Sequence, residues 1–109
     1  MTEPRLIRKY ANRRLYDTVR SRYVNLADVR NLIADGVRVK VVEQSTTRDI
    51  TNSILLQIIG SMEKDDGAIL TTAFLTELIR TAGRGHDPDL PERLQSALRG
   101  SMPPPQLAQ

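Results

Sequence analysis

The 109-residue chain has 39% hydrophobic and 4% aromatic residues and a net charge of +3, a composition typical of one small globular domain. It contains no cysteine, which excludes disulfides, thiolate metal sites and cysteine nucleophiles and is typical of a reducing compartment. Its longest apolar run, residues 54–56, is far too short to cross a membrane, and its first nine residues carry four charges, so we expect neither a membrane segment nor a signal peptide.

The first 24 residues predict three short strands. Alternating polarity places Leu6, Arg8 and Tyr10 on one face of the first strand. Asn12 tolerates a left-handed backbone, so the segment around it predicts a tight turn that leads into a returning strand. The three strands are expected at residues 5–10, 13–17 and 22–24.

A helix and a fourth strand follow. Asn25 is a good N-cap for a helix with apolar residues at helical spacing, and Gly36 is a good stop because glycine readily adopts a positive φ. Residues 37–42 alternate between valine and basic residues up to the last position, which predicts a strand with one polar face. A turn at residues 45–47 is expected to bring residues 48–51 back as a short partner. The apolar residues of the helix are Leu26, Val29, Leu32 and Ile33.

A second helix is expected from Thr51 or Asn52 to Met62. It is apolar almost all round, so it needs cover on several sides. The sequence leaves two explanations open: the helix forms part of an oligomer interface, or the C-terminal helices cover it within one chain. Its candidate contact residues are Ile54, Leu55, Ile58 and Ile59.

The C-terminal part of the chain predicts two amphipathic helices after a polar break. Thr71 or Thr72 caps the third helix, which Gly83 ends. Asp89, with a glutamate three residues later, starts the fourth helix, which Gly100 ends. The apolar stripe of the third helix contains Phe74, Leu75, Leu78 and Ile79.

The expected fold class is therefore α+β. Residues 1–62 form a small N-terminal domain of short antiparallel strands with two helices. Residues 63–100 form a helical oligomerisation region with two C-terminal amphipathic helices. Residues 101–109 form a disordered, proline-rich tail.

Known catalytic and metal-binding patterns are missing from the sequence. His86 is the only histidine, and it lies in a loop flanked by glycine and proline without further ligands. Asp65 and Asp66 are adjacent in a polar linker, where both are simply solvated, and no glycine-rich phosphate loop occurs. We therefore expect no enzymatic activity, no cofactor and no metal.

Positive charge and tyrosine side chains are concentrated in residues 1–24. This segment holds seven basic and two acidic residues and all three tyrosines, whereas residues 25–109 hold nine basic and eleven acidic residues. Arginine binds phosphates and guanine edges, and a two-stranded ribbon fits the major groove of DNA. Alternatively, the charges form a solvated face, the tyrosines pack as strand residues, and Arg13 or Arg14 pairs with Asp17. The candidate DNA-binding residues are Arg5, Arg8, Lys9, Tyr10, Asn12, Arg13, Arg14, Tyr16 and Arg22.

Residues 5–18 read R-L-I-R-K-Y-A-N-R-R-L-Y-D-T, and S-R-Y-V at 21–24 and L-A-D-V at 26–29 follow. Further along are D-I-T at 49–51 and S-I-L-L-Q-I-I at 53–59. Such a long string of basic residues and tyrosines is uncommon. Over residues 5–62 the chain resembles the N-terminal domain of the polyhydroxyalkanoate (PHA) synthesis repressors, and residues 72–80 more loosely resemble the start of the second region of that family.

The resemblance implies a bacterial, cytoplasmic transcriptional regulator that represses PHA synthesis and granule-associated genes. It implies binding of double-stranded promoter DNA through the N-terminal domain and release from DNA when the protein binds the polymer granule, so that it is found at the nucleoid or the granule. We expect a homo-oligomer, a dimer or a tetramer. Candidates for oligomer or granule contact are Ile54, Leu55, Ile58, Ile59, Phe74, Leu75, Leu78 and Ile79.

Two other functions are kept as alternatives. An oligomeric protein-interaction module would hold its arginines in internal salt bridges and would ignore added DNA. An RNA-binding regulator would prefer single strands, whose exposed bases can stack on aromatic side chains such as Tyr10 or Tyr16.

Overall fold

The computed structural model describes residues 3–65, 67, 69–85 and 87–101, and the chain divides into two compact units. The first unit spans residues 1–69 and the second residues 70–109. The boundary expected at residue 62 falls inside a helix that continues to Asp65. His86 and the proline-rich residues of the expected tail lie outside the described residues.

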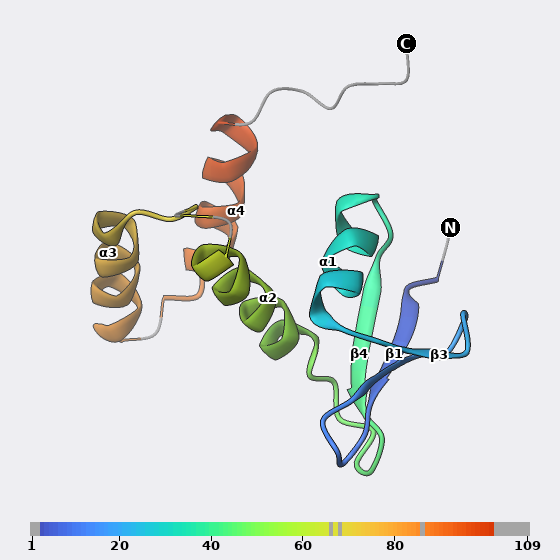
Figure 1. Ribbon diagram of the computed structural model, residues 1–109. Helices are drawn as coiled ribbons and strands as arrows, with labels where there is room; N and C mark the ends of the chain where they lie inside the picture. Colours follow the sequence, from blue (N-terminus) through green and yellow to red (C-terminus); the bar gives the residue numbers. More distant parts are fainter. Residues whose placement is uncertain (1–2, 66, 68, 86, 102–109) are drawn as a thin grey trace. The chain divides into compact units, whose positions relative to one another are not determined.

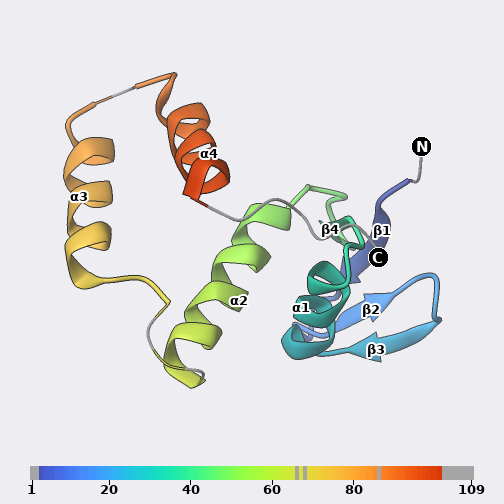
Figure 2. The ribbon, with the colours of Figure 1, turned by 90° about the horizontal axis from the view of Figure 1, so that it is seen from above.

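The first unit contains a four-stranded sheet with the order β3-β2-β1-β4 (Figures 1 and 2). Strands β1 and β2 are antiparallel, and so are β2 and β3, as expected for a chain that reverses through two short turns. Strand β4 instead lies parallel to β1. The strands are β1 (Arg5–Lys9), β2 (Leu15–Asp17), β3 (Arg22–Val24) and β4 (Val39–Glu43).

The parallel pair corrects the expectation of an all-antiparallel sheet. A helix lies between β3 and β4 in the chain, and a connection that crosses one face of a sheet can return a strand in the parallel sense. The segment 48–51 contributes only a single bridge, between Val42 and Asp49, and no fifth strand. The fold class is therefore α+β, as predicted, with a mixed sheet.

Helices are found in the four regions where they were predicted. Thr71 caps α3 as expected, because its side chain accepts a hydrogen bond from the Phe74 N–H. Helix α4 continues one residue past Gly100, which was expected to end it. The four helices are α1 (Leu26–Ala34), α2 (Thr51–Asp65), α3 (Thr72–Gly83) and α4 (Leu90–Ser101).

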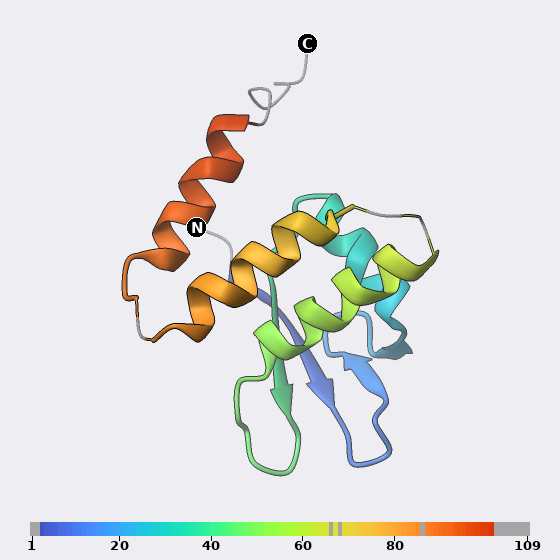
Figure 3. The same ribbon diagram turned by 90° about the vertical axis from the view of Figure 1, so that its left-hand side faces the viewer.

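Helices α1 and α2 cover one face of the sheet, and the core lies between these two helices and the sheet (Figure 3). Ile7 and Val41 are fully buried at the centre of the sheet, at adjacent positions of the parallel pair. The spacing of the apolar residues in α1 and α2 turns one stripe of each helix onto these strands. The buried core is Ile7, Leu15, Val24, Val29, Leu32, Val41, Ile54 and Ile58.

The outer edge of β4 is closed by the segment that leads into α2. The Ile50 N–H donates to the Val41 carbonyl at 2.8 Å, and the Val41 N–H donates to the Thr51 hydroxyl oxygen at 2.9 Å. The Thr51 hydroxyl donates to the Asp49 carboxylate at 2.6 Å, and this bond, together with that from the Thr51 N–H, lowers the pKa of Asp49. These bonds satisfy the outward N–H and carbonyl groups of Val41, so the middle of this edge is covered.

Helix α1 begins with a complete capping box. The Asp28 N–H donates to the Asn25 side-chain oxygen at 2.8 Å, and the Asn25 N–H donates to the Asp28 carboxylate at 2.9 Å. Replacing Asn25 by alanine removes one of these acceptors, so Asn25→Ala is expected to lower the free energy of unfolding by about 1 kcal/mol in urea denaturation. Asn31→Ala, on the exposed side of the same helix, is the matched control and should change it by less than about 0.5 kcal/mol. Equal losses in the two variants would show that the cap contributes nothing.

The second unit consists of α3 and α4. Neither helix has a buried side chain among the residues whose burial is described. Phe74 and Leu75 are exposed, as is Ile79, whose exposed fraction is 71%. Among the described residues, no helix is both long and apolar enough to cross a membrane.

Candidate nucleic-acid interface

The sheet face opposite α1 and α2, which we call the outer face, gathers basic and tyrosine side chains from four strands. Ile7 points into the core, so its neighbour Arg8 points to the outer face, and the strand register aligns Arg8 with Tyr16 and Tyr16 with Tyr23. No strand residue on this face is acidic. The outer face consists of Leu6, Arg8, Tyr10, Arg14, Tyr16, Tyr23, Lys40 and Val42.

The three tyrosines pack against one another in edge-to-face geometry. The ring centroids of Tyr16 and Tyr23 are 5.4 Å apart, and those of Tyr10 lie 6.1 Å from Tyr16 and 6.2 Å from Tyr23. The interplanar angles are 65° to 82°, the arrangement in which the positive edge of one ring meets the negative face of another. Such pairs restrict the rings, so the cluster forms a rigid platform with three hydroxyl groups.

Two arginines are positioned on the outer face by this platform and by the 44–47 turn. The guanidinium carbon of Arg14 lies 3.9 Å above the centroid of the Tyr23 ring, within cation–π range. Arg8 donates from Nη1 to the Gln44 side-chain oxygen at 3.0 Å, and its buried Nε has no hydrogen-bond partner among the described residues. Neither guanidinium is neutralised by a carboxylate in the part of the chain that the structure describes.

Arg5 is held on the other side of the sheet by a buried carboxylate. Its Nη1 lies 3.1 Å from Oδ2 of Asp17, which is fully buried. Oδ1 of Asp17 accepts hydrogen bonds from the N–H groups of Val19 and Arg20, at 2.9 and 3.1 Å. Burial raises the pKa of Asp17, but the hydrogen bonds from Arg20, Val19 and Arg5 outweigh it, so the net shift is downward. The partner of Asp17 is therefore Arg5, and not Arg13 or Arg14, which the sequence had offered as an alternative.

The remaining basic candidates lie away from the outer face. Arg13 is at the tip of the β1–β2 turn with a φ of 66°, so this residue takes the left-handed conformation expected for Asn12. Asn12 instead accepts a hydrogen bond from the Arg14 N–H through its side chain, at 3.1 Å. Lys9 and Arg22 follow the core-facing alternation of β1 and β3 but sit at strand ends, where their charges can reach solvent.

Two basic or aromatic residues of the outer face were missing from the candidates taken from the sequence. Tyr23 completes the aromatic cluster, and Lys40 adds a third cation from β4. Period-2 alternation could have assigned Tyr23 to this face once β2 and β3 were paired. Lys40 could not be assigned in that way, because its position depends on the parallel pairing of β4 with β1.

The apolar candidates for oligomer or granule contact separate into buried and exposed residues. Ile54 and Ile58, with exposed fractions of 1% and 5%, belong to the core of the first unit. Their expected place on a contact surface is therefore wrong for this chain by itself. Leu55 packs against this core, whereas Ile59 is exposed. One stripe of α2 is therefore covered within the chain, but by the core of the first unit and not by the C-terminal helices that were expected to cover it. Another stripe is exposed, including Leu56, which was not among the candidates. Of the α3 candidates, Leu78 is half-buried and the other three are exposed.

Most of the first unit is similar to a known protein family. The family model of the PHB/PHA accumulation regulator DNA-binding domain matches residues 6–66. The chain belongs to this family. The matched region contains the whole sheet except Arg5, together with α1 and α2. Within the described residues, no group of three or more histidine, aspartate or glutamate side chains is placed to hold a metal ion.

Two curated relatives match this chain over 83 residues, 76% of its length. One is described as an uncharacterized protein in the phbA 5′ region of Thiocystis violacea and is 48% identical over 60% of its own length. The other is an uncharacterized protein of Allochromatium vinosum, 45% identical over 54% of its length. The chain thus spans a little over half the length of these relatives. No solved structure matches the chain significantly.

Proposed function

We propose that the protein is a transcriptional repressor of PHA synthesis and granule-associated genes that binds promoter DNA with the outer face of its sheet. The observation that carries this proposal is the Arg14 guanidinium held on the tyrosine platform, on the same face of the sheet as Arg8 and Lys40, where no strand residue is acidic. A guanidinium packed flat on a ring keeps its N–H groups at its edge, where they can donate to phosphates or to guanine.

Duplex DNA is favoured over single-stranded RNA by the packing of the rings. Single-strand recognition needs free aromatic faces on which bases can stack. Here the three rings are engaged with one another, and one face of Tyr23 is covered by Arg14. The hydroxyl groups and the arginine N–H donors remain for contacts to the phosphate backbone.

A protein-interaction module that holds its arginines in internal salt bridges is less well supported. Of the basic candidates, Arg5 has such a bridge, to Asp17, whereas Arg8, Arg13 and Arg14 have none among the described residues. Release from DNA by the polymer and assembly into an oligomer are part of the proposal. Their candidate surfaces are the exposed apolar stripe of α3 in the second unit and, separately, the exposed Ile59 of α2 in the first unit.

The proposal is tested by fluorescence anisotropy of a labelled duplex that carries the upstream region of the protein's own gene, beside a scrambled duplex, across a salt series. We expect tighter binding to the native duplex. With about five phosphate contacts per protomer, the logarithm of affinity should fall with the logarithm of salt concentration with a slope of about −4 to −5. Arg13→Ala/Arg14→Ala should make the slope shallower. Weak and equal binding to both duplexes, unchanged by these substitutions, would instead favour the protein-interaction module.

A further inference from the structure

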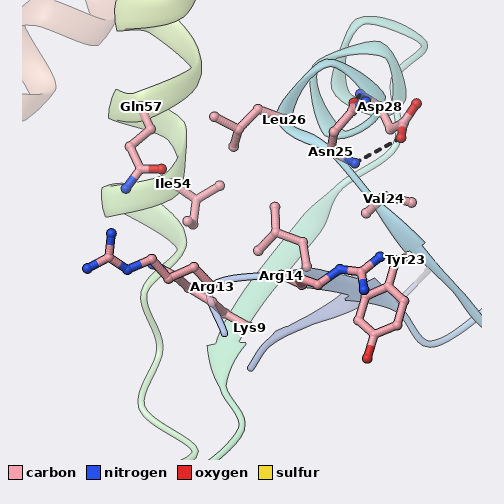
Figure 4. A pocket seen from close by; sticks show the side chains of 11 residues that line it. Lys9, Arg13, Arg14, Tyr23, Val24, Asn25, Leu26, Asp28, Ile54 and Gln57 are labelled. Carbon is pink, nitrogen blue, oxygen red and sulfur yellow. Dashed lines mark hydrogen bonds between the residues drawn. The ribbon is translucent and has the colours of Figure 1, made fainter. Parts of the chain in front are cut away.

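A hollow of about 870 Å³ opens at the end of the sheet, beside the outer face (Figure 4). The β1–β2 turn, the start of α1 and the first turns of α2 surround it, and residues of β1, β2 and β3 complete its lining. In the close view, Arg13 and Gln57 lie on one side, Asn25 and Asp28 on the other, and Arg14 extends toward Tyr23. All of these residues belong to the first unit, so the hollow is formed within one compact body.

The rim of the hollow is cationic. Lys9, Arg13 and Arg14 contribute three positive charges, and Asp28 is the one acidic residue among those that line it. The Asp28 carboxylate is already an acceptor in the capping box of α1. No carboxylate is paired with Lys9 or Arg13 in the described part of the chain. The uncompensated charge favours an anion.

The floor of the hollow is aliphatic. Leu15, Val24 and Ile54 line it as core residues with exposed fractions of only 5%, 9% and 1%, and the half-buried Leu26 adds a more open apolar wall. Gln57 adds an exposed amide on α2. Simple phosphate would use the rim alone and leave this floor in contact with water, whereas an aliphatic group on the anion would cover it.

We propose that this hollow binds a small organic anion, with a phosphate or carboxylate head at Lys9, Arg13 and Arg14 and a short aliphatic part on the floor. Arg14 lines the hollow and also packs on Tyr23 of the outer face. An anion bound there neutralises charge next to the DNA-binding surface and weakens DNA binding, and DNA weakens anion binding by the same factor. This second effect rests on the proposed function; binding of the anion does not.

The test is an NMR titration of backbone amides in the full chain with hexyl phosphate, hexanoate, inorganic phosphate and hexanol. We expect hexyl phosphate or hexanoate to shift amides around the hollow and to bind about tenfold more tightly than inorganic phosphate or hexanol, because only the first two satisfy rim and floor together. The preferred head group follows from which of the two binds more tightly. Arg13→Ala should weaken binding about tenfold, whereas Arg99→Ala, an exposed arginine of α4, should leave it unchanged.

A second variant separates the hollow from the DNA surface. Gln57→Trp fills the hollow from an exposed helical position without altering charge, so it should abolish binding of the organic anion and leave DNA affinity within about twofold. Saturating hexyl phosphate should weaken DNA binding about fivefold in the native chain and not in Gln57→Trp. Equal binding of inorganic and hexyl phosphate, or shifts that survive Gln57→Trp, would overturn the proposal. If the anion binds but the protein ignores DNA, the hollow stands and the proposed function fails.

Discussion

Asp17→Ala is expected to lower the free energy of unfolding by about 3 kcal/mol, the largest effect on stability of any single substitution considered. The carboxylate is fully buried and accepts hydrogen bonds from Val19, Arg20 and Arg5. Alanine leaves the Arg5 guanidinium without its acceptor and two turn amides unpaired, at the turn that joins β2 to β3. Urea denaturation followed by circular dichroism measures the loss.

Two further variants separate charge from hydrogen bonding at this site. Asp17→Asn keeps an oxygen for the two amides, so it should destabilise the fold less than alanine does. Asp35→Ala removes an exposed carboxylate and should change stability by less than about 0.5 kcal/mol. If Asp17→Ala had no larger effect than Asp35→Ala, the carboxylate would not be holding the turn.

The same carboxylate predicts a dependence of stability on pH. The pKa of Asp17 is lowered in the folded state from its ordinary value of 3.8, so the unfolded chain binds more protons in the interval between the two values. The contribution of the ionised Asp17 carboxylate to the free energy of unfolding is therefore fully present above pH 3.8 and is lost as the pH falls from there through the pKa of the folded state. In Asp17→Asn this part of the loss of stability at low pH should disappear. The part due to Asp49, whose pKa is also lowered, should remain.

Arg8→Ala/Arg14→Ala is expected to weaken binding to the promoter duplex about 100-fold, the largest functional effect predicted here. Both side chains lie on the outer face, and two lost phosphate contacts should make the salt slope shallower by about two. The charge-matched control is Arg84→Ala/Arg99→Ala, which removes two exposed arginines of the second unit. Anisotropy titration of both variants, with circular dichroism to verify folding, makes the comparison.

The two doubles also test which surface binds DNA. If the two double variants weakened DNA binding equally, only the net charge of the chain would determine the affinity, and the outer face would not be the interface. Arg14→Lys keeps the charge but removes the planar guanidinium that packs on Tyr23. Compared with the native chain, it should therefore keep the salt slope but lose part of the affinity for the native duplex. Retention of both would show that Arg14 acts only as a point charge.

Much of the local structure was predictable from the sequence. Asn25, Gly36 and Thr71 mark helix ends by their own chemistry, because a cap depends on residues only a few positions apart. The motif in residues 5–24 identified the family, which the match over residues 6–66 confirmed. Arg8, Tyr10 and Tyr16 could be chosen as candidates because charge and aromatic residues are concentrated in one stretch of chain, and the structure places all three on the outer face, where their role in DNA binding stays a prediction.

The tertiary structure alone decided how those residues are divided between two faces. Arg5, Arg8 and Lys9 are close in sequence, yet Arg5 is engaged by a buried carboxylate, Arg8 lies on the outer face, and Lys9 is at the rim of the hollow. The parallel return of β4, which adds Lys40, and the burial of Ile54 and Ile58 depend on contacts between residues more than twelve positions apart. Local propensity fixes caps and alternation, whereas strand order and face follow from the burial of one common core, to which distant segments contribute together.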